Sequence, residues 1–163
     1  MCNAFLPIIP PKGRVVNVSS VACHLKNFSS QSLVSAITSP QLDIPKLTTM
    51  IESYLTLLRT GIDPSTHGWP NNCYSVTKAA VTALTAILAR QYPDKLINSC
   101  CPGWVDTDMG SKASGAGTRP PKSVDEGARI PVRLAVGDAQ NVSGAFWENK
   151  SISDKGWGMV STW

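Results

Sequence analysis

The 163-residue sequence lacks long hydrophobic runs and lacks any cluster of like charges. Its longest apolar stretch covers residues 4–9, far short of the roughly 18 residues that span a membrane. The chain does not open with a basic segment and an apolar core, so it shows no secretory signal. The net charge is only +4 and the basic residues are scattered, which gives no support for a nucleic-acid partner. We therefore expect a cytoplasmic protein that binds neither membranes nor nucleic acids.

Metal and disulfide patterns are also missing. The five cysteines are an odd number, and none has the C-x-x-C or Cys/His spacing of a zinc site. Asp106 and Asp108 lie close together, but no third ligand is spaced to join them. The two histidines, His24 and His67, are isolated and are interpreted as solvent-facing loop residues without a catalytic part. No metal is predicted.

The hydrophobic pattern predicts alternating strands and helices. The chain is 42% hydrophobic and 16% charged, which is typical of a folded protein, and its length suggests one domain. Residues 21–39 are interpreted as a loop, and residues 111–122 as a stretch of low order. Strands are predicted at 14–20, 96–101 and 143–147, and helices at 45–59, 74–91 and 123–136. This order predicts an α/β fold with a mostly parallel sheet.

Tyr74 and Lys78 form the most informative local pattern. They lie four residues apart at the start of a predicted helix, so their side chains point the same way. An ammonium close to a phenol favours the phenolate, which brings tyrosine acid–base chemistry toward neutral pH. Ser20 ends a predicted buried strand, and strand ends are where open α/β sheets bind ligands. A Pro-Gly turn at 102–103 follows the second predicted strand in the same way.

In this order the three segments resemble the short-chain dehydrogenase/reductase superfamily. Its pattern is N-V-S-S at the end of the fifth strand, Y-x-x-x-K in the next long helix and P-G-x-x-x-T after the sixth strand, matched here at 17–20, 74–78 and 102–107. The sequence is more closely similar to carbonyl reductases, which share the G-R-V-V-N-V-S-S, G-W-P and C-C-P-G-W-V-x-T-D-M blocks at 13–20, 68–70 and 100–109. Carbonyl reductases also carry an inserted helical segment, here about residues 21–72.

This resemblance implies three catalytic residues. Ser20 would hydrogen-bond the substrate carbonyl, and Tyr74 would give its proton to the carbonyl oxygen as hydride arrives at carbon. Lys78 would favour the tyrosinate and hold the nicotinamide ribose. Asn17 is interpreted as structural. The implied substrate is a small carbonyl compound.

The resemblance also implies NADPH as the cofactor. Besides Tyr74 and Lys78, its nicotinamide end would contact four residues of the Pro-Gly segment: Pro102, Gly103, Val105 and Thr107. Trp104 and Cys101 would line the substrate pocket, with Cys101 as a candidate reactive thiol. The adjacent Cys100 and Cys101 are poorly placed to form a disulfide with each other and are more typical of small core residues.

Several parts of the superfamily pattern are absent from the sequence. No Gly-rich turn follows a predicted first strand, and the N-N-A-G string and the helix-four Asn are missing. The implied fold is therefore the C-terminal half of a Rossmann-like doubly wound parallel sheet, with strands five to seven and flanking helices. Residues 1–163 would form a single partial domain. Its first strand would present an open edge through which chains could self-associate, although the parent protein is expected to be monomeric.

Three functional hypotheses follow. In the first, the parent enzyme reduces ketones, aldehydes or quinones with NADPH, and this chain supplies its Ser, Tyr and Lys. In the second, the chain is a truncated, catalytically inactive fragment or a partner-binding remnant without the cofactor-binding half. In the third, the parent is another short-chain reductase with a different substrate. A serine hydrolase is disfavoured, because the S-x-x-K string at 75–78 has no S-D-N or K-T-G partner.

Overall fold

The computed structural model describes residues 2–112 and 118–163, which are organised around a four-stranded sheet. The strands lie in the order β1 (Arg14–Val18), β2 (Leu96–Cys100), β3 (Phe146–Glu148) and β4 (Met159–Ser161). The first three are parallel, and β4 pairs antiparallel with β3. The predicted α/β fold with a mostly parallel sheet is confirmed. The assignment of the parallel strands as five to seven of a larger sheet stays a prediction.

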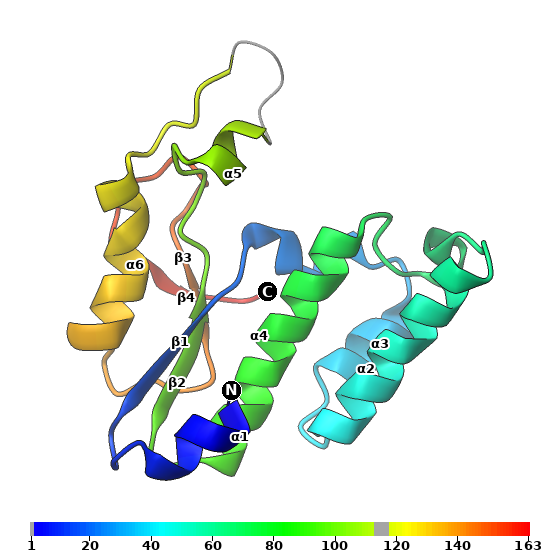
Figure 1. Cartoon of the computed structure of the whole chain (residues 1–163), viewed down its shortest axis with the longest axis horizontal. Helices are drawn as coiled ribbons and strands as arrows, with labels where there is room; N and C mark the ends of the chain where they lie inside the picture. The colour runs from blue at the N-terminus through cyan, green and yellow to red at the C-terminus, as the bar shows by residue number, and fades with distance from the viewer. Residues whose placement is uncertain (1, 113–117) are drawn as a thin grey trace.

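Helices cover both faces of this sheet (Figure 1). Helix α4 (Cys73–Gln91) packs on one face against β1 and β2, and α6 (Val124–Val136) packs on the other. Between them, Ile97 and Cys100 of β2 are completely buried. A strand covered on both faces has no polar side to present, which explains why the sequence of β2 does not alternate cleanly between apolar and polar residues.

Side-chain caps fix where the two main helices begin. The Asn72 side chain accepts a hydrogen bond from the Ser75 N–H at 2.8 Å and starts α4 one residue before the predicted position. Ser123 and Glu126 form a complete capping box at the start of α6, as the sequence predicts. Both helices therefore start at places that short-range sequence chemistry specifies.

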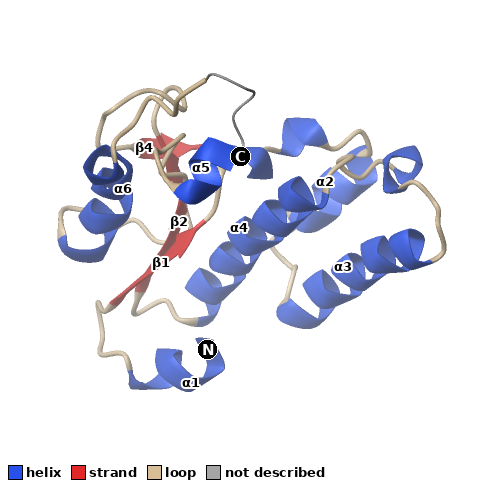
Figure 2. Cartoon of the chain, turned by 45° about the horizontal axis from the view of Figure 1, so that its top comes forward, coloured by secondary structure: helices blue, strands red, loops and turns tan. Residues whose placement is uncertain are grey.

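Residues 21–72, which the sequence analysis interprets as an inserted segment, form a helical layer on the side of α4 that faces away from the sheet (Figures 1 and 2). The predicted helix at 45–59 is confirmed as α3 (Ile44–Arg59). The interpretation of 21–39 as loop is wrong for α2 (Gln31–Ile37), a short helix that Ser30 caps by accepting from the Leu33 N–H. Helix α2 has only seven residues and Ile37 is its one buried residue, so its sequence shows no extended amphipathic pattern. Three 3-10 turns complete the segment: η2 (Val21–Cys23), η3 (Leu25–Asn27) and η4 (Pro64–His67).

A backbone contact closes the inserted segment on itself. The Gly68 carbonyl accepts hydrogen bonds from the N–H groups of Ser29 and Ser30, at 3.0 and 3.3 Å. Gly68 has φ +83°, and a Cβ there would lie 2.2 Å from Ser30 Cβ, so this close approach requires glycine. Beside it, the buried Trp69 ring packs against Tyr54, with ring centroids 5.4 Å apart. The two ends of the segment are thus held together next to α4.

Three short helices complete the described residues. Helix α1 (Cys2–Phe5) and the turn η1 (Leu6–Ile8) precede β1, and α5 (Asp108–Lys112) follows the Pro-Gly turn. The end of α5 overlaps the stretch 111–122, for which low order is predicted, and residues 113–117 of that stretch lie outside the described residues. Within the described part of the chain, no helix combines the length and apolar character needed to cross a membrane.

Candidate active site

One cavity of about 720 Å³ lies at the carboxyl ends of β1 and β2, beside the start of α4. All nine residues predicted for the site line it: Ser20, Tyr74, Lys78, Cys101, Pro102, Gly103, Trp104, Val105 and Thr107. Much of the remaining wall is made of apolar side chains that the sequence analysis did not single out: Val18, Val21, Met109, Val124 and Ile152. Val124 and Ile152 belong to distant parts of the chain, so no local motif signals their presence.

Tyr74 and Lys78 stand on the first two turns of α4, facing the cavity. The Lys78 ammonium lies 5.6 Å from the centroid of the Tyr74 ring. It also donates a hydrogen bond to the carbonyl of Val18 at 3.0 Å, at the end of β1. The Tyr74 side chain is 46% exposed, so its hydroxyl is accessible to a ligand. The helix therefore presents a phenol and a cation together at an open site.

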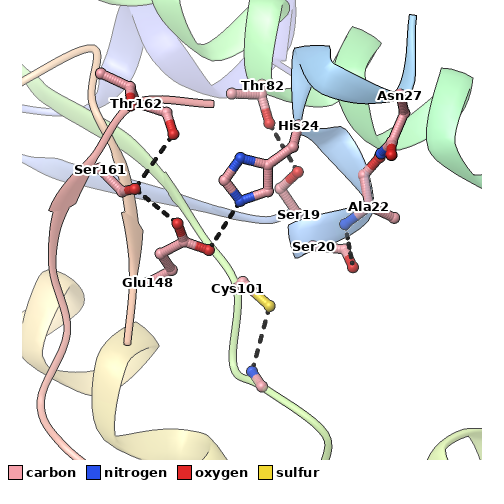
Figure 3. A network of polar contacts seen from close by, with 11 residues as sticks. Ser19, Ser20, Ala22, His24, Asn27, Thr82, Cys101, Glu148, Ser161 and Thr162 are labelled. Atoms are coloured by element: carbon pink, nitrogen blue, oxygen red, sulfur yellow. Dashed lines mark hydrogen bonds and ion pairs between the residues drawn. The ribbon is translucent and has the colours of Figure 1, made fainter. Parts of the chain in front are cut away.

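The two serines that follow β1 have different surroundings. Ser19 is buried, and its Oγ lies 3.1 Å from the Lys78 carbonyl oxygen and 2.7 Å from the Thr82 hydroxyl, which joins the strand end to α4. Ser20 is half-buried at the cavity, and its Oγ accepts the Ala22 N–H at 3.2 Å (Figure 3). A hydroxyl that accepts in this way still has its own hydrogen to donate. Ser20 can therefore bind a carbonyl oxygen, while Ser19 holds the turn.

Asn17 also connects β1 to α4. Its side-chain amide donates to Thr85 Oγ1 at 2.9 Å, one turn further along the helix from Thr82. It is not among the residues that line the cavity. This contact supports the interpretation of Asn17 as a structural residue.

The opposite wall of the cavity is the segment 101–107. Its turn is made at Gly103, which has φ +87° and donates its N–H to Cys101 Sγ at 3.3 Å. The Trp104 indole N–H donates to the Gly110 carbonyl at 2.9 Å, and the Gly110 N–H donates to the Thr107 hydroxyl at 3.1 Å. Val105 rests on Gly127 of α6, where a Cβ would come within 2.4 Å of its methyl group. The shape of this wall therefore depends on local hydrogen bonds and on the long-range contact between Val105 and Gly127.

The thiols near the cavity are buried. Burial raises the pKa of Cys101, and it raises the pKa of Cys23 to about 11 and that of Cys100 to about 12. A thiol with a raised pKa contains little thiolate at neutral pH and is a weak nucleophile. The environment of Cys101, which is 4% exposed, therefore argues against the expectation of a reactive thiol.

The interpretation of His24 as solvent-facing is wrong. Its Nε2 lies 3.1 Å from Glu148 Oε2, and the two side chains are only 19% and 12% exposed. The other oxygen of Glu148 accepts from the Ser161 hydroxyl at 2.6 Å, so one carboxylate joins the turn after Ser20 to β4 (Figure 3). Because His24 and Glu148 are 124 positions apart, no local pattern could reveal the pair. His67 is exposed, as predicted.

Metal ligation finds no support in the described residues. Asp106 pairs with Arg119, with 2.8 Å between its Oδ2 and the guanidinium Nη2. Within residues 2–112 and 118–163, no three His, Cys, Asp or Glu side chains gather into a group that could hold a metal ion.

The chain matches a protein-family model and several known reductases. A family model described as enoyl-(acyl carrier protein) reductase matches residues 31–146. Carbonyl reductase (NADPH) 1 of Mus musculus is 38% identical over 162 residues, covering 93% of this chain and 56% of the relative. Its Homo sapiens counterpart is 36% identical with the same coverage. The chain thus spans a little over half the length of these relatives.

Two solved structures of reductases superpose on this chain. Salutaridine reductase from Papaver somniferum superposes with a TM-score of 0.76 and 27% identity, covering 89% of this chain and 49% of the other. Menthone neomenthol reductase from Mentha piperita superposes with a TM-score of 0.69, also at 27% identity, covering 90% and 45%.

Proposed function

The chain belongs to the short-chain dehydrogenase/reductase family, and from this premise we propose that it takes part in the NADPH-dependent reduction of ketones, aldehydes or quinones to alcohols. Membership makes it an oxidoreductase by family. The observation that carries the proposal is that Ser20, Tyr74 and Lys78 line one cavity together with the segment 101–107. A carbonyl group in this cavity would meet a hydroxyl donor, a phenol and a cation at once.

Each of the three side chains has a separate task in this proposal. Ser20 donates its hydroxyl hydrogen to the substrate oxygen and orients the carbonyl. Tyr74 transfers its phenolic proton to that oxygen as negative charge develops on it. The tyrosinate that forms is stabilised by the Lys78 ammonium, which lies 5.6 Å from the centre of the ring. The nicotinamide of NADPH supplies the hydride when it is bound.

The residues of the cavity fit the nicotinamide end of such a cofactor. An ammonium has three donors, and Lys78 uses one of them on the Val18 carbonyl, which leaves two for ribose hydroxyls. Pro102, Gly103, Val105 and Thr107 would receive the nicotinamide ring, while Trp104 would form a wall against the substrate. The apolar lining suits the hydrocarbon part of a ketone or quinone.

A titration tests this proposal. NADPH is added to the purified chain, binding is followed by dihydronicotinamide fluorescence, and an aromatic ketone or a naphthoquinone is then supplied. The proposal expects NADPH oxidation that falls at least about 100-fold in Tyr74→Phe. Tyr92→Phe, at the far end of α4, is the matched control and should keep the wild-type rate.

A second candidate function is a catalytically inactive, partner-binding chain. It is favoured by the sequence, in which no Gly-rich phosphate-binding turn follows a strand. The same titration separates the two. A folded chain that binds no NADPH and gives no turnover would support the second candidate, whereas NADPH binding with Tyr74-dependent turnover would contradict it.

We also propose that chains can associate through β1, the outer strand of the described sheet. The Gly13 carbonyl and the Ser19 N–H bond toward β2, so the alternate residues Arg14 and Val16 direct their backbone groups to the open edge. The Val18 carbonyl also points away from β2, but it already accepts a hydrogen bond from Lys78. Replacing Val16 by proline removes one N–H from this edge and leaves the β1–β2 ladder intact. Sedimentation should detect concentration-dependent dimers of the wild type and fewer dimers of Val16→Pro. A wild type that stays monomeric would contradict this association.

A further inference from the structure

Lys122 is a fully buried cation immediately behind the cavity. Its side chain is 1% exposed, and its ammonium donates to the Pro102 carbonyl with a distance of 2.6 Å. Among residues 2–112 and 118–163, none of the ion pairs includes Lys122. Burial lowers the pKa of the Lys122 ammonium, as expected for a charge removed from water without a close carboxylate. A methionine would fill similar space without this penalty, so the charge itself calls for an explanation.

The backbone of Lys122 already fastens part of the cavity wall. Its N–H donates to the Trp104 carbonyl at 3.3 Å, and its own carbonyl accepts the Asp106 N–H at 2.8 Å. Lys122 and Val105 form an isolated parallel bridge between these two bonds. These contacts hold residues 104–106 without any help from the side chain. The ammonium reaches beyond them, to the turn at Pro102 and Gly103.

Gly103 leaves the space that the ammonium occupies. A Cβ at Gly103 would lie 2.9 Å from Lys122 Nζ and 2.7 Å from the Ile152 carbonyl oxygen. The Pro102 carbonyl and the Gly103 N–H belong to one peptide group, and that N–H donates to Cys101 Sγ at 3.3 Å. The contacts therefore form a continuous chain from ammonium to peptide to sulfur, in which the cation polarises the peptide and strengthens its N–H as a donor.

We propose that Lys122 is a positioning residue that fixes the orientation of the Pro102–Gly103 peptide, and with it the cavity wall that receives the nicotinamide end of the cofactor. The role of the wall rests on the proposed function. Pro102 and Gly103 line the cavity, while Lys122 stands behind them and does not line it. An apolar side chain at this position would leave the Pro102 carbonyl without its donor.

Lys122→Met is the test variant, and the exposed Lys150→Met is the matched control for loss of one positive charge. Three quantities are measured: the NMR signals of the Gly103 amide and the Trp104 indole N–H, the stability to denaturant, and the affinity for NADPH. Lys122→Met should shift both NMR signals and weaken NADPH binding about tenfold. It should change stability only slightly, because removal of a buried charge offsets the loss of the donor to the Pro102 carbonyl. Lys150→Met should resemble the wild type in all three.

An alkaline titration supplies a signature that a packing role would not give. The Gly103 amide signal of the wild type should titrate as Lys122 loses its proton below the usual lysine range, and Lys122→Met should lack this step. The other titratable or charged groups that act on Lys122 are Cys101, Asp154, Glu126 and Arg129. Any step from the Cys101 thiol persists in Lys122→Met and is thereby recognised.

Several outcomes would overturn the proposal. Unmoved Gly103 and Trp104 signals in Lys122→Met would show that the ammonium does not set the turn. A large loss of stability in that variant would make Lys122 a structural residue. If the wild type binds no NADPH, the proposed function fails, but the NMR signals and their titration still decide whether Lys122 positions the peptide.

Discussion

The two walls of the cavity are built on different principles. The α4 wall presents Tyr74 and Lys78 from consecutive turns of a 19-residue helix, so their spacing follows from helix geometry. The segment 101–107 has no regular structure of its own and takes its shape from Lys122, Gly127 and Gly110. The proposed catalytic groups Tyr74 and Lys78 thus stand on a regular helix, whereas the wall proposed to receive the cofactor is held mainly by Lys122 and Gly127, which are distant in sequence. Substitutions in the two walls should therefore differ in their effects on turnover, stability and NADPH binding.

The α4 wall is tested by the two neighbouring serines that face it. Ser20→Ala should lower turnover roughly 100-fold, because a donor to the carbonyl oxygen is lost, with little change in stability. Ser19→Ala should do the reverse, costing about 0.5–1.5 kcal/mol of unfolding free energy, because the buried hydrogen bonds of Ser19 to the Lys78 carbonyl and the Thr82 hydroxyl are lost. Steady-state kinetics and denaturant unfolding of both variants separate these effects. Equal loss of turnover in the two variants would contradict a catalytic role for Ser20 and a structural role for Ser19.

The turn after Ser20 is tested through Glu148. Glu148→Ala removes the side-chain partner of His24 and the shorter of the two hydrogen bonds of the Ser161 hydroxyl. It should cost about 2 kcal/mol. The control is Glu52→Ala, since Glu52 pairs with Arg59 at 3.5 Å on the surface and should contribute less than about 1 kcal/mol. Denaturant unfolding measures both. Similar values for the two variants would show that the buried carboxylate does not strengthen the turn.

The segment 101–107 is tested from α6. A methyl group added by Gly127→Ala would come within 2.4 Å of a Val105 methyl, so Val105 must move. We expect a cost of about 1–2 kcal/mol in stability together with weaker NADPH binding, in contrast to Ser20→Ala. Ala128→Leu adds bulk at the next, exposed position of the same helix and serves as control. Unchanged NADPH affinity in Gly127→Ala would indicate that the wall adapts.

The smallest effect on stability is expected at high pH, from the buried thiols of Cys23 and Cys100. A raised pKa in the folded state means that the protein binds more protons than the unfolded chain between about pH 9 and the folded values, which are about 11 for Cys23 and about 12 for Cys100. Stability is therefore complete below pH 9 and falls as pH rises through this window. Cys100→Ala should reduce the slope of unfolding free energy against pH. The same slope in both proteins would contradict this assignment.

Local sequence chemistry predicts the α4 wall well and the other wall poorly. The buried strands, the α6 capping box and the Tyr74–Lys78 spacing each involve residues within a few positions of one another. Lys122 gives no such signal, because a lysine next to two prolines normally indicates an exposed loop, and its burial depends on Pro102, twenty positions away. The sequence does not predict the short elements α2 and β4 for a related reason, since contacts with other parts of the chain stabilise them more than their own sequences do.

The closure at Gly68 has a consequence for how this fold can change over time. The Gly68 carbonyl accepts hydrogen bonds from Ser29 and Ser30, so the two ends of the segment 30–68 lie next to each other. Insertions in the exposed turn after α3, residues 60–63, would alter the outer surface without displacing Ser20 or Tyr74. New surface can therefore be added between Ser30 and Gly68 during evolution without a change in the spacing of Ser20, Tyr74 and Lys78.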